Sequence, residues 1–394
     1  METGFFTIGG LLLLASLVAI AAQRLRLPYS VGLVAAGLGV ALAAPGAVPP
    51  LTPRLIYFVL LPPLVFEAAI QIPWPPLRRE LPLLLALVTL GVALAAGVAM
   101  VGMHYWAGWS WIGAALFGVL IAATDPVSVI ALFREVRVPK RLHLLVEAES
   151  LLNDGAAAVG FAVLTAIAAG EGASAGGIAW DLVRTALGGV GVGVAVAVPL
   201  ILVAGRTEDR LVEVTISTLI AYGAFLAAEH FGCSGVLATL AAGLVTGNWG
   251  FLGSISAGGR QSVLNHWEYV AFLFNSVIFL LIGGGEARVP IGFVVEAAAL
   301  AVALSLAGRA LAVYPVLAAF ARTRLCVPRA YAHVLFWGGL RGALALALAL
   351  ALPATVPERG AIVAVVFAVV AFSIFVQGLT AGPLVRRLGL VRAD

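Results

Sequence analysis

The sequence is poor in charge and in cysteine. Only 11% of its 394 residues are Asp, Glu, Lys or Arg, whereas ordinary soluble domains carry about 25%. Hydrophobic residues make up 62% of the chain, and the mean hydropathy is +1.10. This composition excludes an ordinary soluble domain. The two cysteines, Cys233 and Cys326, are far apart and not at metal-ligand spacing, so we expect them to be free thiols.

Other absences narrow the class of function. The chain has no phosphate-binding GxxxxGK loop, which argues against ATP-driven pumping. None of the five histidines has a partner at metal-ligand spacing. The net charge of +4 is small and is no sign of nucleic-acid binding. We therefore expect no nucleotide, no cofactor and no soluble domain.

Long apolar runs fill the chain instead. A transmembrane helix needs about 20 apolar residues, and thirteen segments qualify, separated by proline, glycine and charged clusters. Their approximate ranges are 4–22, 30–45, 53–72, 81–103, 108–133, 144–170, 182–204, 210–231, 233–250, 269–286, 290–320, 331–352 and 360–385. The sequence therefore predicts an all-α polytopic membrane protein, one transmembrane domain over residues 1–394.

The basic residues predict an orientation. With the N-terminus outside, seventeen of the 23 Lys and Arg residues fall on the inside and four on the outside. The remaining two, Arg309 and Arg341, lie within apolar segments. Because cytoplasmic loops carry an excess of positive charge, this alternation favours thirteen helices with the N-terminus outside and the C-terminus inside.

Two carboxylates, Asp125 and Asp154, fall near the middle of the predicted membrane, in the fifth and sixth segments. An ionised side chain there costs on the order of 3 kcal/mol or more, which makes both functional candidates. Asp125 precedes Pro126, and an Asp-Pro pair is typical of an N-cap and first helical residue. We therefore predict that the fifth helix is broken, as in transporters that bind ions between half-helices.

Helical spacing sorts the polar residues of the sixth segment. Ser150 and Asp154 are four residues apart and share a face, which offers a hydroxyl and a carboxylate to a hard cation such as Na⁺. Glu149 and Asn153 share the adjacent face. We expect this second pair to belong to a buried polar network that includes an arginine.

Further charged residues lie in other segments. Arg341, in Gly338-Gly339-Leu340-Arg341-Gly342, marks a second predicted break, in the twelfth helix, because glycines weaken a helix. Glu149 is expected to pair with Arg341 or with Arg309, and both arginines are expected to balance charge rather than carry the ion. Glu67 is expected to contact the ion directly or through water. Glu147 is expected nearer the inner surface, where His143 could tune the pH response.

The two predicted breaks occupy equivalent positions if segments 1–6 and 8–13 are repeats. The first repeat would begin outside and the second inside, so the two would be inverted. This arrangement places a binding site between the two broken helices.

Four motifs together resemble a known family. They are Leu61-Pro62-Pro63 leading to Glu67, Thr124-Asp125-Pro126-Val127, Glu149-Ser150-Leu151-Leu152-Asn153-Asp154-Gly155 and Gly338-Gly339-Leu340-Arg341-Gly342-Ala343. With these four motifs in this order, the chain is similar to monovalent cation:proton antiporters of the NhaP and sodium/proton exchanger type. The resemblance implies a homodimer in the cell (inner) membrane that serves pH homeostasis. It also implies a mobile core of helices 3–6 and 10–13 beside dimerisation helices 1–2 and 7–9.

The resemblance also implies roles for individual residues. Asp154 and Asp125 would bind Na⁺, with Ser150 and Thr124 as further ligands and Glu67 as a peripheral acid. Asn153 resembles the Asn-Asp members, which are generally electroneutral. The implied mechanism is one-for-one exchange, in which Asp154 holds either a proton or a sodium ion.

Other functions remain open at this stage. Li⁺ or K⁺ could replace Na⁺, because sequence does not give the geometry of the cavity. A cation channel would also use acids at mid-depth. An intramembrane protease is the enzyme alternative, since Gly232-Cys233-Ser234-Gly235 matches the GxSG pattern. A protease of this kind requires a histidine partner for the serine. The simpler interpretation of Gly232-Cys233-Ser234-Gly235 is a flexible start to the ninth helix. We therefore expect a transporter and not an enzyme.

Overall fold

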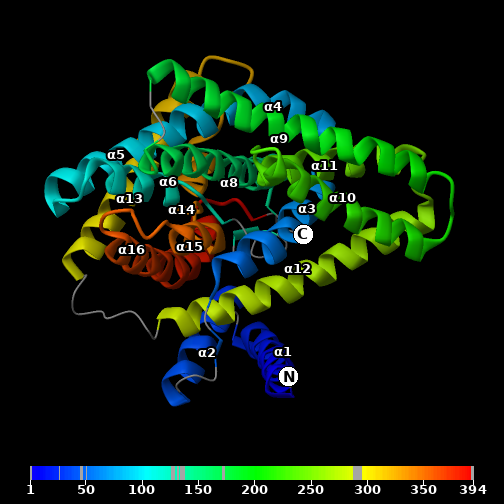
Figure 1. Cartoon of the computed structure of the whole chain (residues 1–394), viewed down its shortest axis with the longest axis horizontal. Helices are drawn as coiled ribbons and strands as arrows, with labels where there is room; N and C mark the ends of the chain where they lie inside the picture. Colours follow the sequence, from blue (N-terminus) through cyan, green and yellow to red (C-terminus); the bar gives the residue numbers. More distant parts are fainter. Residues whose placement is uncertain are drawn as a thin grey trace.

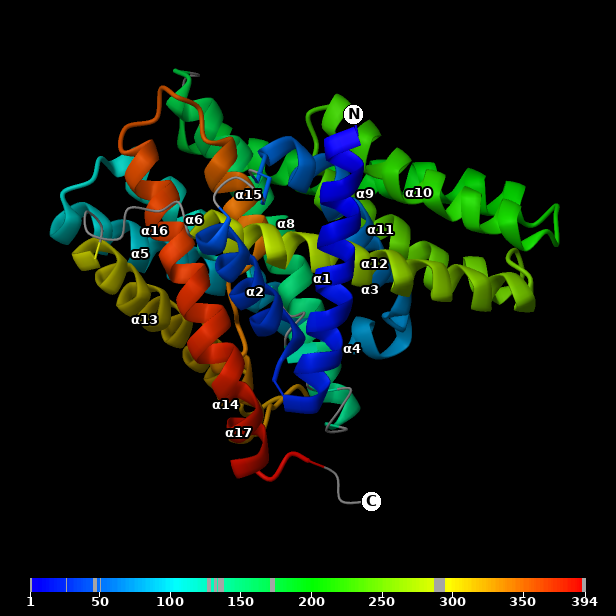
Figure 2. The same cartoon turned by 90° about the horizontal axis from the view of Figure 1, so that it is seen from below.

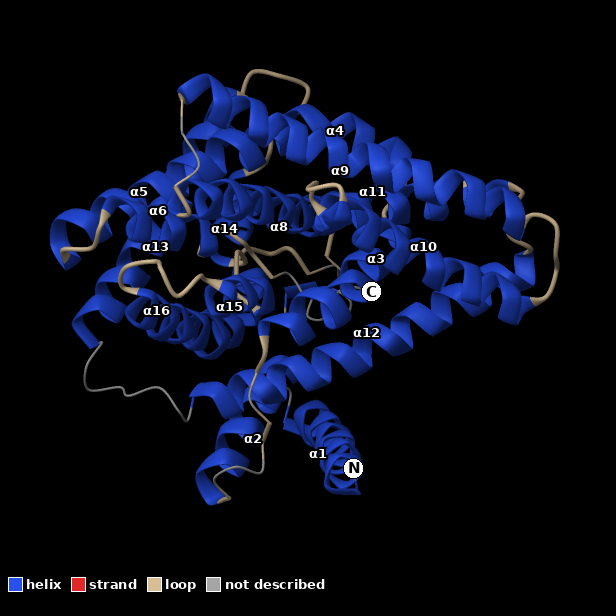
Figure 3. Cartoon of the chain, in the orientation of Figure 1, coloured by secondary structure: helices blue, strands red, loops and turns tan. Residues whose placement is uncertain are grey.

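The computed structural model describes residues 2–25, 27–44, 48–49, 51–125, 129–130, 133, 138–170, 174–286 and 295–391. Within these ranges the chain forms helices joined by loops and turns, and Figure 3 shows no strand among them. The predicted all-α class is therefore confirmed.

The first half of the chain contains helices of very different length. They are α1 (Glu2–Leu25), α2 (Tyr29–Ala43), the π-helical η1 (Leu55–Leu60), α3 (Leu61–Gln71), α4 (Trp74–Ala86), the π-helical η2 (Leu87–Gly91), α5 (Val92–Ala107), α6 (Trp111–Leu120), α8 (Lys140–Ala168) and α9 (Ala175–Ala204).

The second half continues in the same way. Its helices are α10 (Arg210–His230), α11 (Gly235–Asn248), the 3-10 turn η3 (Gly250–Leu252), α12 (Ala257–Glu286), α13 (Val295–Ala319), α14 (Arg329–Trp337), α15 (Ala343–Ala351), α16 (Arg359–Phe372), the π-helical η5 (Ser373–Gly378) and α17 (Leu379–Arg387).

The helices have the length and composition of membrane spans. In the described part of the chain, seven continuous helical stretches are long and apolar enough to cross a bilayer, and five shorter apolar helices accompany them. Many exposed side chains are large and apolar, such as Leu187 and Leu219, which are 66% and 55% exposed. The membrane character predicted from composition is confirmed, while the count of thirteen spans, the orientation and the repeats stay predictions.

Both predicted breaks lie where the helices end. α14 stops at Trp337 and α15 begins at Ala343, so the glycine-rich stretch between them is not helical, as predicted. α6 ends at Leu120, and Thr124 and Asp125 follow in non-helical backbone. The predicted role of Pro126 as the first residue of a second half-helix lies outside the described residues.

The helices fall into two groups in space. Figures 1 and 2 place α1 and α2 beside α12, while α9 to α11 pack on one another toward the right of Figure 1, where α10 contacts α12. α5, α6, α13 and α16 lie on the other side, and α8 runs between the groups.

Two helix crossings on the α12 side bring backbones into contact. A Cβ atom at Gly37 of α2 would overlap the carbonyl of Leu280 in α12. A Cβ atom at Gly247 of α11 would overlap the carbonyl of Ile70 in α3. Small residues allow such close approach between membrane helices, so α2 packs tightly on α12 and α3 on α11.

Candidate functional site

The two non-helical stretches cross near the centre of the molecule. The backbone N–H of Asp125 donates a hydrogen bond of 2.7 Å to the carbonyl of Leu340. Each stretch leaves the last carbonyls of the preceding helix without helical partners, and such groups need other donors inside a membrane. Two arginines supply those donors.

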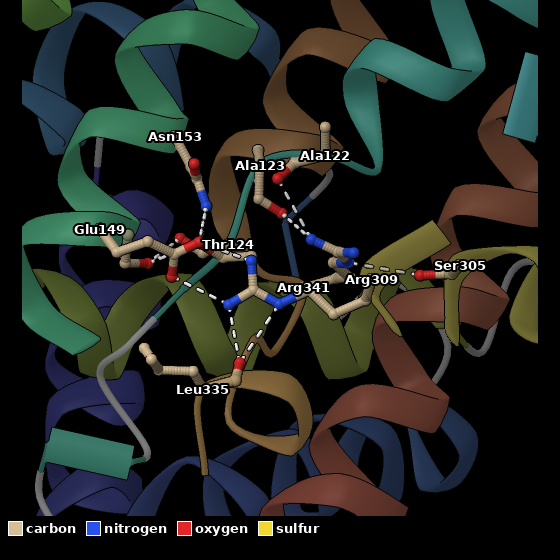
Figure 4. Close-up of polar contacts among 10 residues, drawn as sticks. Ala122, Ala123, Thr124, Glu149, Asn153, Ser305, Arg309, Leu335 and Arg341 are labelled. Carbon is tan, nitrogen blue, oxygen red and sulfur yellow. Dashed lines mark hydrogen bonds and ion pairs between the residues drawn. The ribbon is translucent and has the colours of Figure 1, made fainter. Parts of the chain in front are cut away.

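Arg341 binds the carbonyls that follow α6. Its Nη1 donates to the carbonyls of Ala122 (3.2 Å) and Ala123 (3.1 Å), and its Nε donates to Ser305 Oγ of α13 (3.4 Å). The residue is 3% exposed. A cation at a helix C-terminus is favourable because the backbone dipoles leave partial negative charge there, and Figure 4 shows these contacts meeting at one guanidinium.

Arg309 binds both Glu149 and the end of α14. Its Nη1 and Nη2 donate to the two Glu149 carboxylate oxygens at 2.5 and 2.9 Å. Its Nε and Nη2 donate to the carbonyl of Leu335 at 3.2 and 2.7 Å. The sequence left open which arginine pairs with Glu149, and in the structure it is Arg309 (Figure 4).

A network of polar groups joins α8 to the stretch that follows α6. Ser150 Oγ lies 2.9 Å from Thr124 Oγ1 and 2.5 Å from the Thr124 carbonyl, to which it donates. Asn153 Nδ2 donates to Glu149 Oε1 (2.6 Å) and to Thr124 Oγ1 (3.2 Å). The predicted buried network of Glu149 and Asn153 is thus present, and it includes Thr124.

A cavity of about 100 Å³ adjoins this network. Four acids contribute to its wall: Glu67 of α3, Glu147 and Asp154 of α8, and Asp125. A volume of this size has room for an ion with a few water molecules. One oxygen, Asp154 Oδ1, is buried without a hydrogen-bond partner among the described residues, and a buried carboxylate oxygen in that state needs a proton or a cation.

The predicted ligands do not all face this cavity. Asp154, Asp125, Thr124 and Glu67 line it, and Gln71 Nε2 donates to Glu67 Oε1. Ser150 is not part of the lining, because its hydroxyl turns toward Thr124. The structure therefore brings four of the five predicted residues to the cavity wall.

Glu147, expected nearer the inner surface than the ion site, is one of the residues that line the cavity. It precedes Asp154 by about two turns of α8, and its Oε2 is 3.5 Å from His143 Nε2. Because His143 is one helical turn away and more exposed, the pair connects the cavity with the end of α8.

Asn275 of α12 also lines the cavity, and sequence reasoning missed it. The signal that could have found it is simple: Asn275 and Ser276 are the polar residues of an otherwise apolar run, 270–282. An amide oxygen is a suitable ligand for a hard cation. Its position adds α12 to the helices that form the wall.

Gly342 sets the space available to Asp125. A Cβ atom at Gly342 would overlap the Asp125 side chain, including Oδ2. Gly342 also precedes the first residue of α15, and its neighbour Ala343 lines the cavity. The positive end of α15 is therefore directed toward the acids of the cavity.

The residues of the protease alternative have other roles. Ser234 Oγ accepts from Leu237 N (3.3 Å) and caps α11. His333 Nδ1 is 2.8 Å from the hydroxyl of Tyr314 in α13. Gly232-Cys233-Ser234-Gly235 is thus the start of a helix, as the simpler interpretation predicted, and both Cys233 and Cys326 are free thiols.

Comparison with known proteins agrees with this architecture. Residues 11–387 match the family "Sodium/hydrogen exchanger, transmembrane". The chain is 37% identical to the Na(+)/H(+) antiporter NhaS2 of Synechocystis sp., over 96% of this chain and 70% of that protein. It is 36% identical to the Na(+)/H(+) antiporter ApNhaP of Aphanothece halophytica, over 96% of this chain and 73% of that protein.

A solved structure shares the fold. The sodium proton antiporter MjNhaP1 from Methanocaldococcus jannaschii, determined at pH 8, superposes with a TM-score of 0.79. The match covers 98% of this chain and 99% of MjNhaP1, at 19% identity. The chain therefore belongs to the sodium/hydrogen exchanger family of multi-pass membrane transporters.

Proposed function

We propose that the protein is a secondary active sodium:proton antiporter. The relatives named Na(+)/H(+) antiporters cover nearly the whole chain and support this class of transport. The observation that carries the proposal is the buried Asp154 Oδ1, which has no hydrogen-bond partner within the described ranges and lies beside a cavity whose wall includes Asp125, Thr124 and Glu67. Oxygen ligands from carboxylates, hydroxyls and carbonyls suit a small hard cation.

Competition for Asp154 couples the two substrates. In this proposal Asp154 holds either a proton or, together with Asp125 and Thr124, a sodium ion. Ser150 orients Thr124 through its two contacts, and Glu67 and Asn275 act from the periphery of the cavity. An empty, charged site would leave uncompensated charge within the membrane, which opposes movement without cargo.

The neutral Asn153 favours one-for-one exchange. It cannot titrate, and its amide binds Glu149 and Thr124. Glu149 in turn is neutralised by Arg309. One proton per sodium ion then leaves the net charge moved at zero, and a membrane potential should not alter the exchange rate.

Alternating access would come from movement of one group of helices against the other. We propose a mobile core of the predicted helices 3–6 and 10–13, and dimerisation through helices 1–2 and 7–9, in a homodimer with the N-terminus outside. α3 and α12 contact helices of both groups, so they form the boundary of this division. Cross-linking of α1 or α9 to its copy in membranes tests the dimer.

Reconstitution into liposomes that contain a pH-sensitive dye tests the function. A sodium gradient should drive proton movement in the wild type, and Asp154→Asn should abolish it because the amide cannot carry the proton. Glu296→Gln is the matched control, since Glu296 is an exposed acid in the first turn of α13. Wild-type activity in Asp154→Asn would refute the assignment.

Two further readouts separate the alternatives. Apparent affinity for sodium should fall as proton concentration rises, and unchanged affinity would contradict competition for one site. The same assay with LiCl and KCl identifies the cargo, and potassium-driven exchange of equal rate would favour a potassium:proton antiporter. Flux far above carrier rates, without proton movement, would indicate a channel.

A further inference from the structure

A second cavity, which shares no lining residue with the first, lies between α13, α14 and α17. Its volume is about 450 Å³. Figure 2 shows these three helices next to each other at one end of the molecule, with α1, α9 and α10 elsewhere. Nothing in the proposed transport cycle uses this cavity.

Its wall is mostly aromatic and apolar. Tyr314, Phe336 and Trp337 contribute neighbouring rings, with centroids 5.5 Å apart for the first two and 6.0 Å for the last two. Leu384 of α17 faces them. None of the eight lining residues that the structure describes is acidic, so none of them can neutralise a cation.

A positively charged side chain, that of Arg387, lies at the end of this cavity, which has the form of a groove. It lies in the last turn of α17, is exposed, and has no hydrogen bond or ion pair with the residues that the structure describes. The polar groups deeper in the wall have partners: Tyr314 pairs with His333 (2.8 Å), and Trp337 Nε1 donates to Thr380 Oγ1 (2.8 Å). The guanidinium is therefore available to bind an anion at this end of the groove.

The groove combines a cationic end with an apolar wall, the pattern that an anionic lipid headgroup and one acyl chain require. Arg387 ends the apolar stretch Arg359–Arg387, which places it at the level of the lipid headgroups. Thr380 is seven residues earlier, roughly 10 Å deeper along the helix at 1.5 Å per residue. Arg387 at the end of the groove is complementary to an anionic headgroup, and the aromatic side chains along the groove are complementary to an acyl chain.

We propose that this groove, with Arg387 at its mouth, binds an anionic phospholipid such as phosphatidylglycerol. The headgroup phosphate accepts hydrogen bonds from Arg387, and an acyl chain lies against Phe336 and Trp337. The bound lipid packs on α14, whose other contacts include the Leu335 carbonyl held by Arg309. The lipid thus stabilises the half-helix that supports the Glu149–Arg309 pair.

Quenching of tryptophan fluorescence by brominated lipids tests the proposal in proteoliposomes. Trp337 is isolated as the difference between the wild type and Trp337→Phe. At equal mole fraction, brominated phosphatidylglycerol should associate with Trp337 about fivefold more strongly than brominated phosphatidylcholine, since one basic residue near an anionic surface is worth about 1 kcal/mol.

Arg387→Ala and Arg386→Ala form a matched pair for this test. Both remove one positive charge from the same helical turn, but Arg386 does not line the groove. Arg387→Ala should abolish the preference, and Arg386→Ala should leave it unchanged. Equal quenching by both lipids in the wild type, or equal loss in both variants, would overturn the proposal. Loss of the preference on adding inorganic phosphate would indicate a free-anion site and also overturn it.

Thermal unfolding in detergent provides a second readout that needs no change of Trp337. Added phosphatidylglycerol should raise the melting temperature of the wild type and of Arg386→Ala, and phosphatidylcholine should raise neither. Arg387→Ala should show no such shift. A shift of wild-type size in Arg387→Ala would contradict a site at this arginine.

Discussion

The Glu149–Arg309 pair allows a quantitative test of how the central site is held together. The two side chains are 3% and 7% exposed, and hydrogen bonds of 2.5 and 2.9 Å join them. Glu149→Gln removes the charge but keeps an oxygen for Asn153, and it leaves Arg309 without its carboxylate. Because a buried charge that loses its partner destabilises a protein by about 3–5 kcal/mol, we expect the free energy of unfolding to fall by that amount.

A double-mutant cycle separates the pair from its surroundings. Arg309→Gln alone should cost a similar amount, whereas Glu149→Gln with Arg309→Gln leaves two neutral amides that can bind each other. The double variant should therefore be more stable than the sum of the single losses predicts, by about 2–3 kcal/mol. Denaturant titration in mixed micelles, followed by tryptophan fluorescence, measures each variant.

The exposed Arg386 supplies the control for this cycle. Arg386→Gln should change the free energy of unfolding by less than about 0.5 kcal/mol, as surface substitutions usually do. Strictly additive losses for Glu149→Gln and Arg309→Gln would refute the reasoning. Single losses as small as the control would refute it as well.

Three other substitutions address the geometry around the cavity. Gly342→Ala should destabilise the protein by about 1–3 kcal/mol and impair exchange, because its Cβ would overlap the neighbouring aspartate, while Gly360→Ala, with open space around it, should behave as wild type in both assays. Ser150→Ala should raise the KM for sodium about fivefold with little change in kcat, since it removes the hydroxyl whose two contacts orient Thr124, a net loss of about 1 kcal/mol; an unchanged KM would argue against this role. Arg341→Lys should lower the melting temperature in detergent, because an ammonium cannot reproduce the forked contacts of the guanidinium, and equal stability would contradict the capping role.

Local spacing was enough to predict part of this site. The rise per residue of a helix predicts that Asp125 and Asp154 lie level with each other, and both line one cavity. The glycines around Arg341 predict the break before α15. These features depend on residues close together in the sequence. They could be read without knowing how the helices pack.

The partners of the charged groups depend on tertiary packing instead. Arg309 and Arg341 lie at similar predicted depth, and only the directions of their helices bring Arg309 to Glu149 and Arg341 to the carbonyls after α6. Ser150 shares a helical face with Asp154, yet the non-helical backbone beside it draws its hydroxyl away from the cavity. Asn275 was not predicted because one uncharged amide hardly alters the mean hydropathy of a long apolar helix.

The two crossing stretches also constrain the order of assembly. Arg341 caps the carbonyl of Ala122, which precedes it by 219 residues, and Leu340 accepts the N–H of Asp125. During synthesis the aspartates leave the ribosome long before the arginine that caps the backbone beside them exists. Lipid offers no hydrogen-bond donors to the carbonyls of Ala122 and Ala123. The cavity can therefore form completely only after nearly the entire chain has been translated and Arg341 has packed against these carbonyls.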